Sequence, residues 1–142
     1  MKNLKEFIAI PIFAALACAG LHAQNNNLRA TIPFDFHVGN KLMPAGEYVV
    51  EASGPLVRVR SAEGNDPGNV FLATHTSPPA SEGSRAKSEL DFNRYGDEYF
   101  LTTIWNPWIG DGLQAPKTAR EKELAKAGDV KTLATVALAI GK

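Results

Sequence analysis

Hydrophobic and polar residues alternate with a period of two over much of the chain, most clearly within residues 31–51. Such alternation is typical of a strand with one buried and one wet face. The apolar set of the first segment is Ile32, Phe34, Phe36 and Val38. Turn-forming residues 39–46 separate this segment from residues 47–52, where the alternation resumes. The pattern predicts a hairpin with a long connection. Proline cannot donate to a sheet ladder, so Pro33 marks either a sheet edge or the start of a strand.

Similar short segments follow, each bounded by Gly, Pro, Asn or Asp residues that favour turns. The pattern predicts strands at residues 56–60, 70–76, 88–95, 99–105 and 130–140. In residues 70–76 both alternating sets are partly apolar, which leaves open which face is buried; a strand covered on both faces has this composition. Residues 130–140 also tolerate a helix, but their β-branched residues favour a strand.

Only residues 117–127 have a helical pattern. A thin apolar stripe on this otherwise charged segment consists of Ala119, Leu124 and Ala127. Thr118 and Glu121 have the spacing of a capping box, and Gly128 ends the segment. The pattern therefore predicts a mainly β fold: an antiparallel β-sandwich or open barrel of six to seven short strands with one C-terminal surface helix.

Residues 1–23 have the order of a secretory signal peptide: two early lysines, an uncharged run of 14 residues, then a small residue before a polar segment. The uncharged run is shorter than the ~20 residues that cross a bilayer. We expect cleavage after Ala23 and export of residues 24–142, as a single domain, to the periplasm or the extracellular space. The alternative is a lipoprotein signal in which Cys18 becomes the lipidated first residue.

Removal of residues 1–23 leaves 119 residues with a formal charge of minus one. This length is sufficient for one hydrophobic core. The balanced charge does not favour nucleic acid or an anionic membrane surface as a partner. Cys18 is the only cysteine, so the mature domain would be free of disulfides.

No spacing in the chain matches a motif for a nucleophile, a metal or a phosphate-binding loop, so we expect a protein that is not an enzyme and has no cofactor. Asp35, His37 and His75 are weak metal candidates, because two histidines and a carboxylate suit zinc. This set would make the protein a metal-dependent hydrolase. Asp97 and Glu98 are adjacent in a predicted turn, where carboxylates are normally solvated and neighbouring side chains point to opposite faces.

A surface formed by residues 105–112 is the better candidate for binding. Its ligand-binding residues would be Trp105, Asn106, Trp108 and Asp111. Two rings next to Asn and Asp suit sugars and peptides, and Gly112 lets a ligand approach the backbone. The alternative is that Trp105 ends a core strand and Trp108 covers the sheet edge. Arg58 and Arg60 share one strand face, either as a solvated face or as an anion clamp.

Three blocks of the chain, PFDFHVGNKLMPAGEYVVE, LDFNRYGDEYFLTTIW and AREKELA, occur in this order. In these blocks the chain resembles a family of small exported bacterial proteins without an assigned activity. The resemblance implies export and a β fold, and it implies no function. LMPAGEYVV is also similar to the turn-and-strand phrase of transthyretin-like and carboxypeptidase-regulatory-like sandwich domains, which bind or support and do not catalyse.

These observations lead us to expect an exported, non-catalytic binding or interaction module of the cell envelope or extracellular space, with a glycan or an envelope protein as partner. A second hypothesis is a structural or assembly protein that pairs through the strand edge near Pro33. The metal-dependent hydrolase is the third.

Overall fold

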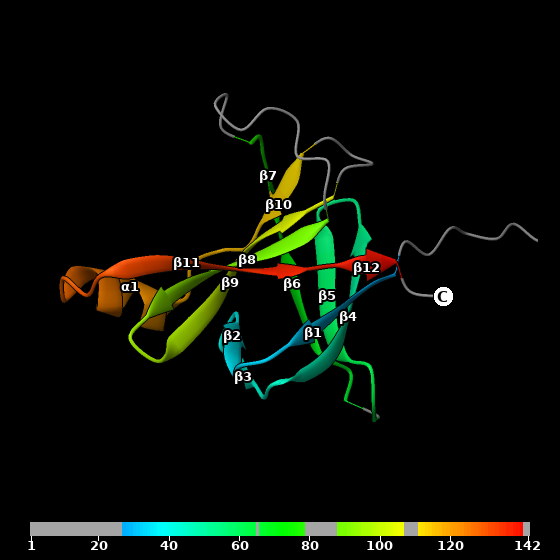
Figure 1. Cartoon of the computed structure of the whole chain (residues 1–142). Helices are drawn as coiled ribbons and strands as arrows, with labels where there is room; N and C mark the ends of the chain where they lie inside the picture. The colour runs from blue at the N-terminus through cyan, green and yellow to red at the C-terminus, as the bar shows by residue number, and fades with distance from the viewer. Residues whose placement is uncertain (1–26, 65, 79–87, 107–110, 141–142) are drawn as a thin grey trace, which may run out of the picture.

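The computed structural model describes residues 27–64, 66–78, 88–106 and 111–140, which form two β-sheets and one helix (Figure 1). Sheet A contains, in spatial order, β12 (Ala139–Ile140), β1 (Leu28–Ile32), β4 (Gly46–Ser53), β5 (Leu56–Ser61) and β6 (Asn69–Leu72). Sheet B contains β11 (Lys131–Ala137), β8 (Glu89–Tyr95), β9 (Glu98–Trp105), β10 (Gly112–Gln114) and β7 (Thr74–Thr76), with β2 (Phe36–Val38) and β3 (Lys41–Met43) attached to β9. The predicted mainly β, sandwich-like fold is confirmed, and the sheets do not form a closed barrel. The predicted signal peptide and Cys18 lie outside the described residues.

Two kinked segments join the sheets at both lateral edges. β6 and β12 are the outer strands of sheet A, and β7 and β11 are those of sheet B. Only Ala73 separates β6 from β7, and only Leu138 separates β11 from β12. Both residues are buried, and their amides donate to Pro55 O (2.7 Å) and Ser88 O (2.9 Å) respectively. Strands that change sheet at a bend make such corners in β-sandwiches.

A further change of sheet divides the first predicted strand. Residues 33–35 separate β1, which pairs with β4, from β2, which pairs with β3 and meets β9. The carboxylate of Asp35 accepts a hydrogen bond from Ala45 N (2.8 Å) and so fixes this bend. The predicted core face is retained, since Ile32, Phe36 and Val38 are at most 1% exposed. Pro33 lies just after β1, where β12 no longer pairs: β12 is matched only with Leu28 and Arg29 at the other end of the strand.

Other predicted strands divide in the same way, and the described residues contain twelve strands instead of six to seven. Residues 70–76 belong to β6 and β7, with Phe71 and Ala73 buried and Leu72 68% exposed, so only one face of β6 is covered. Residues 131–140 form β11 and β12, which confirms the strand assignment. β3 and β10 lie within segments that the sequence assigned to turns and loops.

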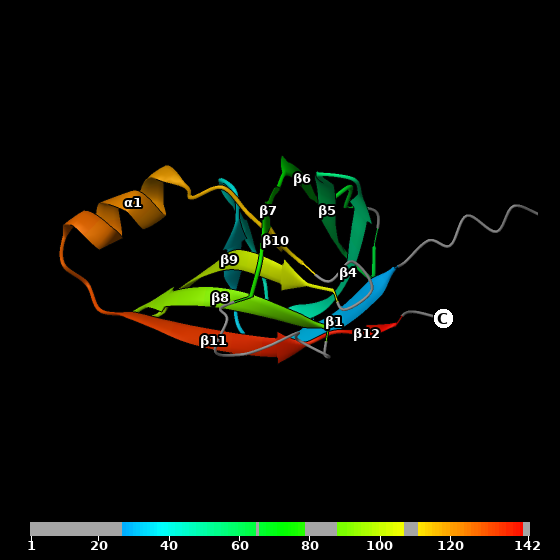
Figure 2. The ribbon, with the colours of Figure 1, turned by 90° about the horizontal axis from the view of Figure 1, so that it is seen from above.

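Helix α1 (Ala119–Lys126) has the predicted cap, with Glu121 N donating to Thr118 Oγ1 (3.1 Å). The predicted apolar stripe is wrong: Ala119 and Ala127 are exposed, and Glu121 is the one buried residue of the helix. Glu121 Oε1 accepts a hydrogen bond from Asn93 Nδ2 on β8 (2.8 Å). Polar contacts, the Asn93–Glu121 hydrogen bond with β8 and the Arg120–Glu98 ion pair with β9, therefore attach the helix to one end of sheet B. Figure 2 shows α1 near that end of β8 and β9.

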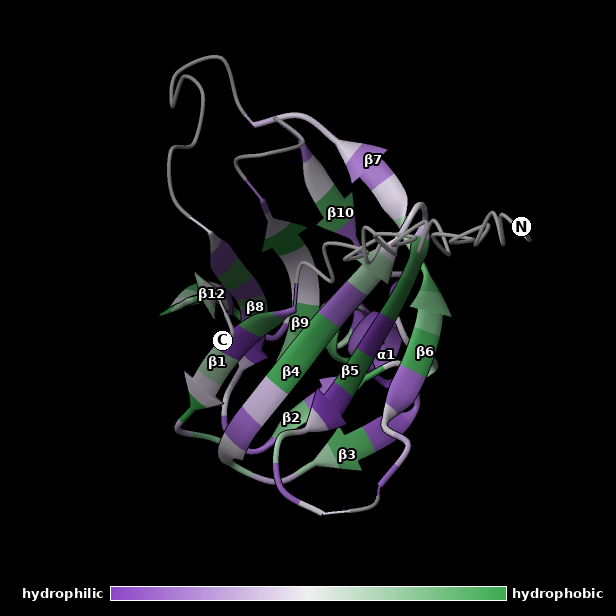
Figure 3. Ribbon diagram, turned by 90° about the vertical axis from the view of Figure 1, so that its right-hand side faces the viewer, coloured by the Kyte–Doolittle hydropathy of each residue, from purple (hydrophilic) through white to green (hydrophobic). Residues whose placement is uncertain are grey.

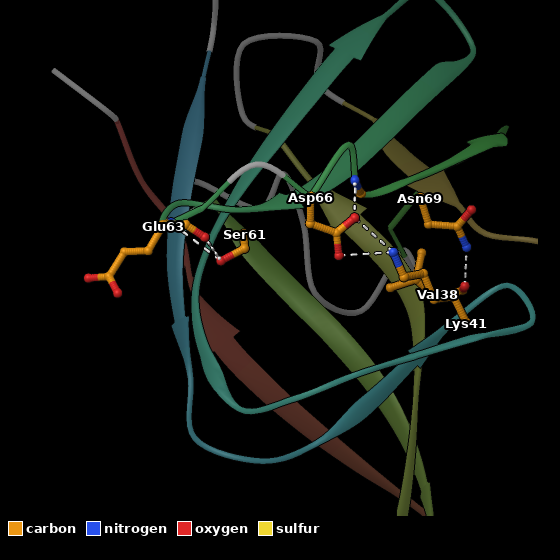
Figure 4. A network of polar contacts seen from close by, with 7 residues as sticks. Val38, Lys41, Ser61, Glu63, Asp66 and Asn69 are labelled. Atoms are coloured by element: carbon orange, nitrogen blue, oxygen red, sulfur yellow. Dashed lines mark hydrogen bonds and ion pairs between the residues drawn. The ribbon is translucent and has the colours of Figure 1, made fainter.

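An ion-pair network ties the connection between β5 and β6 to the β2–β3 hairpin (Figure 4). Lys41 Nζ lies 2.9 and 3.0 Å from the two carboxylate oxygens of Asp66. The Asn69 side-chain amide donates to Val38 O, and Gly68 N donates to Asp66 Oδ1 (2.9 Å). The Lys41 ammonium, and after it the Gly68 N–H, lower the pKa of Asp66. The network fixes the start of β6 against the neighbouring hairpin.

Asp66→Asn removes the charge of this network and should destabilise the protein near neutral pH. A carboxylate with a lowered folded-state pKa stabilises the fold above its unfolded pKa, and this contribution is lost as pH falls through the folded value. The difference in melting temperature between wild type and Asp66→Asn should therefore shrink below about pH 4. Asp97→Asn is the control, because Asp97 is an exposed turn carboxylate without a side-chain partner among the described residues. A difference that is the same at pH 7 and at about pH 2 would contradict the lowered pKa.

Candidate functional site

Trp105, the first residue of the predicted binding surface, is 7% exposed and belongs to sheet B. Its Nε1 donates to Asp91 Oδ2 (2.7 Å), and the other oxygen of Asp91 accepts from Thr135 Oγ1 (3.0 Å). Asp91 is itself 5% exposed. The indole is therefore held as a structural part of the sheet, and it is not an exposed ring on which a sugar could stack.

Gly112 leaves space for the buried indole of Trp105. It lies opposite Trp105 in the β9–β10 ladder. A Cβ at this position would lie 2.8 Å from two atoms of the Trp105 six-membered ring and 2.9 Å from the Thr103 methyl group. Real side chains do not approach so closely, so Gly112 makes room for the indole and not, as the sequence suggested, for a ligand.

A cavity of about 160 Å³ opens between the two sheets, at the ends of β4 and β9. Its apolar walls come from both sheets: Leu28, Val50 and Ala52 from sheet A, and Ile104 and Leu113 from sheet B. Gly54, His75 and Asn106 complete the lining. Since β9 begins at Glu98, which pairs with α1 through Arg120, the cavity and the helix lie at opposite ends of this strand. The cavity is the candidate functional site.

The arrangement suits a small apolar group. A cavity of about 150 Å³ with apolar walls can hold one aromatic ring. The ring nitrogens of His75 could hydrogen bond a polar substituent of a ligand, and the polar side chain of Asn106 also lines the cavity. His75 is exposed and Asn106 is half-buried, so both can reach the solvent side of a ligand.

The other predicted binding residues are distributed around this site. Asn106 lines the cavity, whereas Asp111 is half-exposed and accepts a hydrogen bond from Ser77 Oγ (3.4 Å). Trp108 lies outside the described residues. The apolar walls of the cavity were not predictable from the sequence. A core residue next to a cavity follows the same hydrophobic alternation along the chain as a core residue that is fully packed. His75 was noticed only as a metal candidate.

The three metal candidates do not meet. His37 on β2 stacks on Phe100 (centroids 4.6 Å apart), the Asp35 carboxylate holds the bend before β2, and His75 lines the cavity. Within the described ranges, no group of three His, Cys, Asp or Glu side chains is arranged to hold a metal ion.

The predicted arginine pair is also divided. Arg60 donates to Glu51 Oε1 through Nε (3.2 Å) and a terminal nitrogen (3.0 Å), so it is not available as half of an anion clamp. Arg58 is exposed on the same face of β5. In the β8–β9 turn, Glu98 is engaged by Arg120 (3.2 Å), which leaves no paired carboxylates at the positions considered for acid–base chemistry.

Trp105→Phe keeps an aromatic ring but removes the N–H that Asp91 Oδ2 accepts. Because this carboxylate is buried, we expect the free energy of unfolding to fall by about 1–3 kcal/mol, measured by urea denaturation. A double-mutant cycle with Asp91→Ala isolates the hydrogen bond from the change in ring size. If Trp105→Phe costs as much in the Asp91→Ala background as in wild type, the bond contributes nothing.

No protein-family model matches the chain, and comparisons with curated proteins and with solved structures found no match. Across the part of the chain that the structure covers, no helix is long and apolar enough to span a membrane. The family resemblance of the three sequence blocks stays a prediction. The chemistry of the cavity is therefore the ground for a functional proposal.

Proposed function

We propose that the protein is an exported, non-catalytic binding module that takes a small apolar group into the cavity between its sheets. The observation that carries this proposal is the cavity itself, with apolar walls from both sheets and two polar side chains, His75 and Asn106. Such a combination, mostly apolar with a few polar groups that fix orientation, is typical of small-molecule sites. The signal-peptide pattern of residues 1–23 supports a periplasmic or extracellular location.

Two features favour binding over catalysis. His75 is the only titratable side chain among the described residues that line the cavity, so these residues supply no acid–base pair there. No serine or threonine is among the described lining residues either, so they supply no hydroxyl for His75 to activate. A lone imidazole in an apolar site is suited to hydrogen bonding a ligand.

The dimensions and composition of the cavity narrow the ligand class. About 160 Å³ accommodates a single ring or a short branched chain and is well below the ~300 Å³ or more of sites that enclose drug-sized molecules. The buried position of Trp105 argues against the glycan expected from the sequence, because it removes one of the two stacking rings. A phenol, an indole or a branched short-chain acid has the required shape together with one polar group.

The test is the melting temperature of the purified protein with p-cresol, indole or isovalerate, compared between wild type and Ala52→Phe. Ala52 is an exposed residue that lines the cavity at the end of β4, so a phenyl ring there should obstruct the cavity at its solvent side. At a hundred times its dissociation constant a ligand stabilises the wild type by about 2.7 kcal/mol, a shift of several degrees for a domain of this size. Ala52→Phe should lose this shift.

Ala125→Phe is the matched control, since it adds the same ring at an exposed position of α1. This variant should respond to the ligand as the wild type does. A shift that survives in Ala52→Phe would place the ligand elsewhere, and no shift with any of the three compounds would reject this ligand class.

A further inference from the structure

Among the described residues, the outer edge of β6 has no neighbouring strand. β6 is the last strand of sheet A, and β5 is its one partner in that part of the chain (Figure 3). Ala73 N donates to Pro55 O, which sets the alternation of the antiparallel ladder. The backbone groups of Phe71 therefore point to β5, while those of Val70 and Leu72 point away from it. An incoming strand would find two N–H and two C=O groups at the spacing of a β ladder.

The side chains next to this edge are apolar and exposed. Leu72 is 68% exposed, Val70 42% and Leu56 45%. Leu56 faces Leu72 across the β5–β6 ladder, so the three side chains form one patch on the outer face of sheet A. Natural edge strands are normally protected by lysine, proline or a bulge. β6 contains neither residue, and its register with β5 has no bulge.

Arg58 adds a positive charge to this patch. Glu51 on β4 faces Arg58, but its carboxylate is contacted by Arg60, so two arginines share one carboxylate on this face. On its other side, Arg58 lies directly opposite Val70. The other arginines of the described residues contact a carboxylate, a carbonyl oxygen or a ring: Arg29 with Glu47, Arg60 with Glu51, Arg94 with Gly96 O and Tyr99, and Arg120 with Glu98. Arg58 has no such partner among them. A residue facing Val70 on an added strand would lie about 10 Å away, two strand spacings, within the combined reach of arginine and glutamate side chains.

We infer that β6 is a docking edge for an extended segment of another protein that carries an apolar residue opposite Leu72 and a carboxylate opposite Val70. Addition of a strand obtains affinity from main-chain hydrogen bonds and specificity from alternate side chains. All neighbouring pairs of sheet A are antiparallel. In an antiparallel partner segment, the apolar residue therefore comes first, and the acidic residue follows two positions later in the sequence.

A second copy of the chain fits this edge less well. Pairing β6 with itself would bring apolar residues together, but neither β5 nor β6 contains an aspartate or glutamate to meet Arg58. The contacts of Asn69 with Val38 and of Asp66 with Lys41 fix the start of β6 before any partner arrives (Figure 4). An edge held in this way loses little freedom when it binds.

The test is a titration of the ¹⁵N-labelled protein with the peptide TTVTETT, followed by the amide signals of Val70 and Leu72. These two amides should shift on binding, because they would donate to the added strand. TTVTKTT, in which lysine replaces glutamate, should bind roughly fivefold to tenfold more weakly, since one favourable charge pair becomes repulsive. Arg58→Glu should reverse this preference, while Ala52→Phe, which should obstruct the cavity, should not affect it.

Three results would overturn the inference. They are no shift of either amide at millimolar peptide, equal binding of the two peptides, and shifts of both amides with protein concentration alone, which would identify a second copy as the occupant. Because Arg58 lies outside the cavity lining, a failure here is separate from a failure of ligand binding by the cavity.

Discussion

The carboxylate of Asp91 is the interaction on which much of this structure depends. An ionised carboxylate removed from water is costly unless it is paired or hydrogen bonded, and Asp91 on β8 is 5% exposed. Its two oxygens are shared between Trp105 on β9 and Thr135 on β11, the strands that flank β8. A register slip of either strand by one residue would turn its donor to the opposite face and remove that hydrogen bond from the buried carboxylate. Asp91 therefore specifies the alignment of three strands, in addition to any net stability that it supplies.

The position of the cavity follows from this alignment. Once the indole of Trp105 is fixed, only a residue without a side chain can lie opposite it, and Gly112 meets this requirement at the start of β10. The next residue, Leu113, then points to the inner side, where it forms a wall of the cavity, and Asn106 directly follows Trp105 at its lining. The tryptophan that the sequence suggested as a ligand platform thus acts indirectly, by positioning the residues that line the site.

Local sequence patterns predicted well which side of each strand faces the core. They predicted poorly which strands pair with one another. The alternation from Ile32 to Val38 identified the core-facing side chains, although Pro33 and Asp35 divide the segment between two sheets. A side chain keeps its inward direction when the chain passes from one layer to the other, so a period of two cannot reveal the crossing. In helix α1 the capping box is a local pattern and was predicted from the sequence. The attachment of the helix through Glu121 and Asn93 was not predicted, because these residues are far apart in the sequence. The cavity is likewise a property of packing between sheets, which no local pattern contains.

The two sheets differ in what covers their outer faces, and this difference decides where a partner can bind. The outer face of sheet B is partly covered by polar and aromatic contacts, including Asn93 with Glu121 and His37 with Phe100, although Leu133 on β11 is 61% exposed on this face. On sheet A, exposed or half-exposed ion pairs such as Arg29 with Glu47 and Arg60 with Glu51 occupy the central strands, and such pairs keep a face soluble without contributing much stability. Among the described residues, β6 combines exposed apolar side chains, a free sheet edge and a neighbouring arginine, Arg58 on β5, that contacts no carboxylate directly. Recognition through β6 would therefore require no rearrangement of the core, and the cavity between the sheets would remain free for a separate ligand.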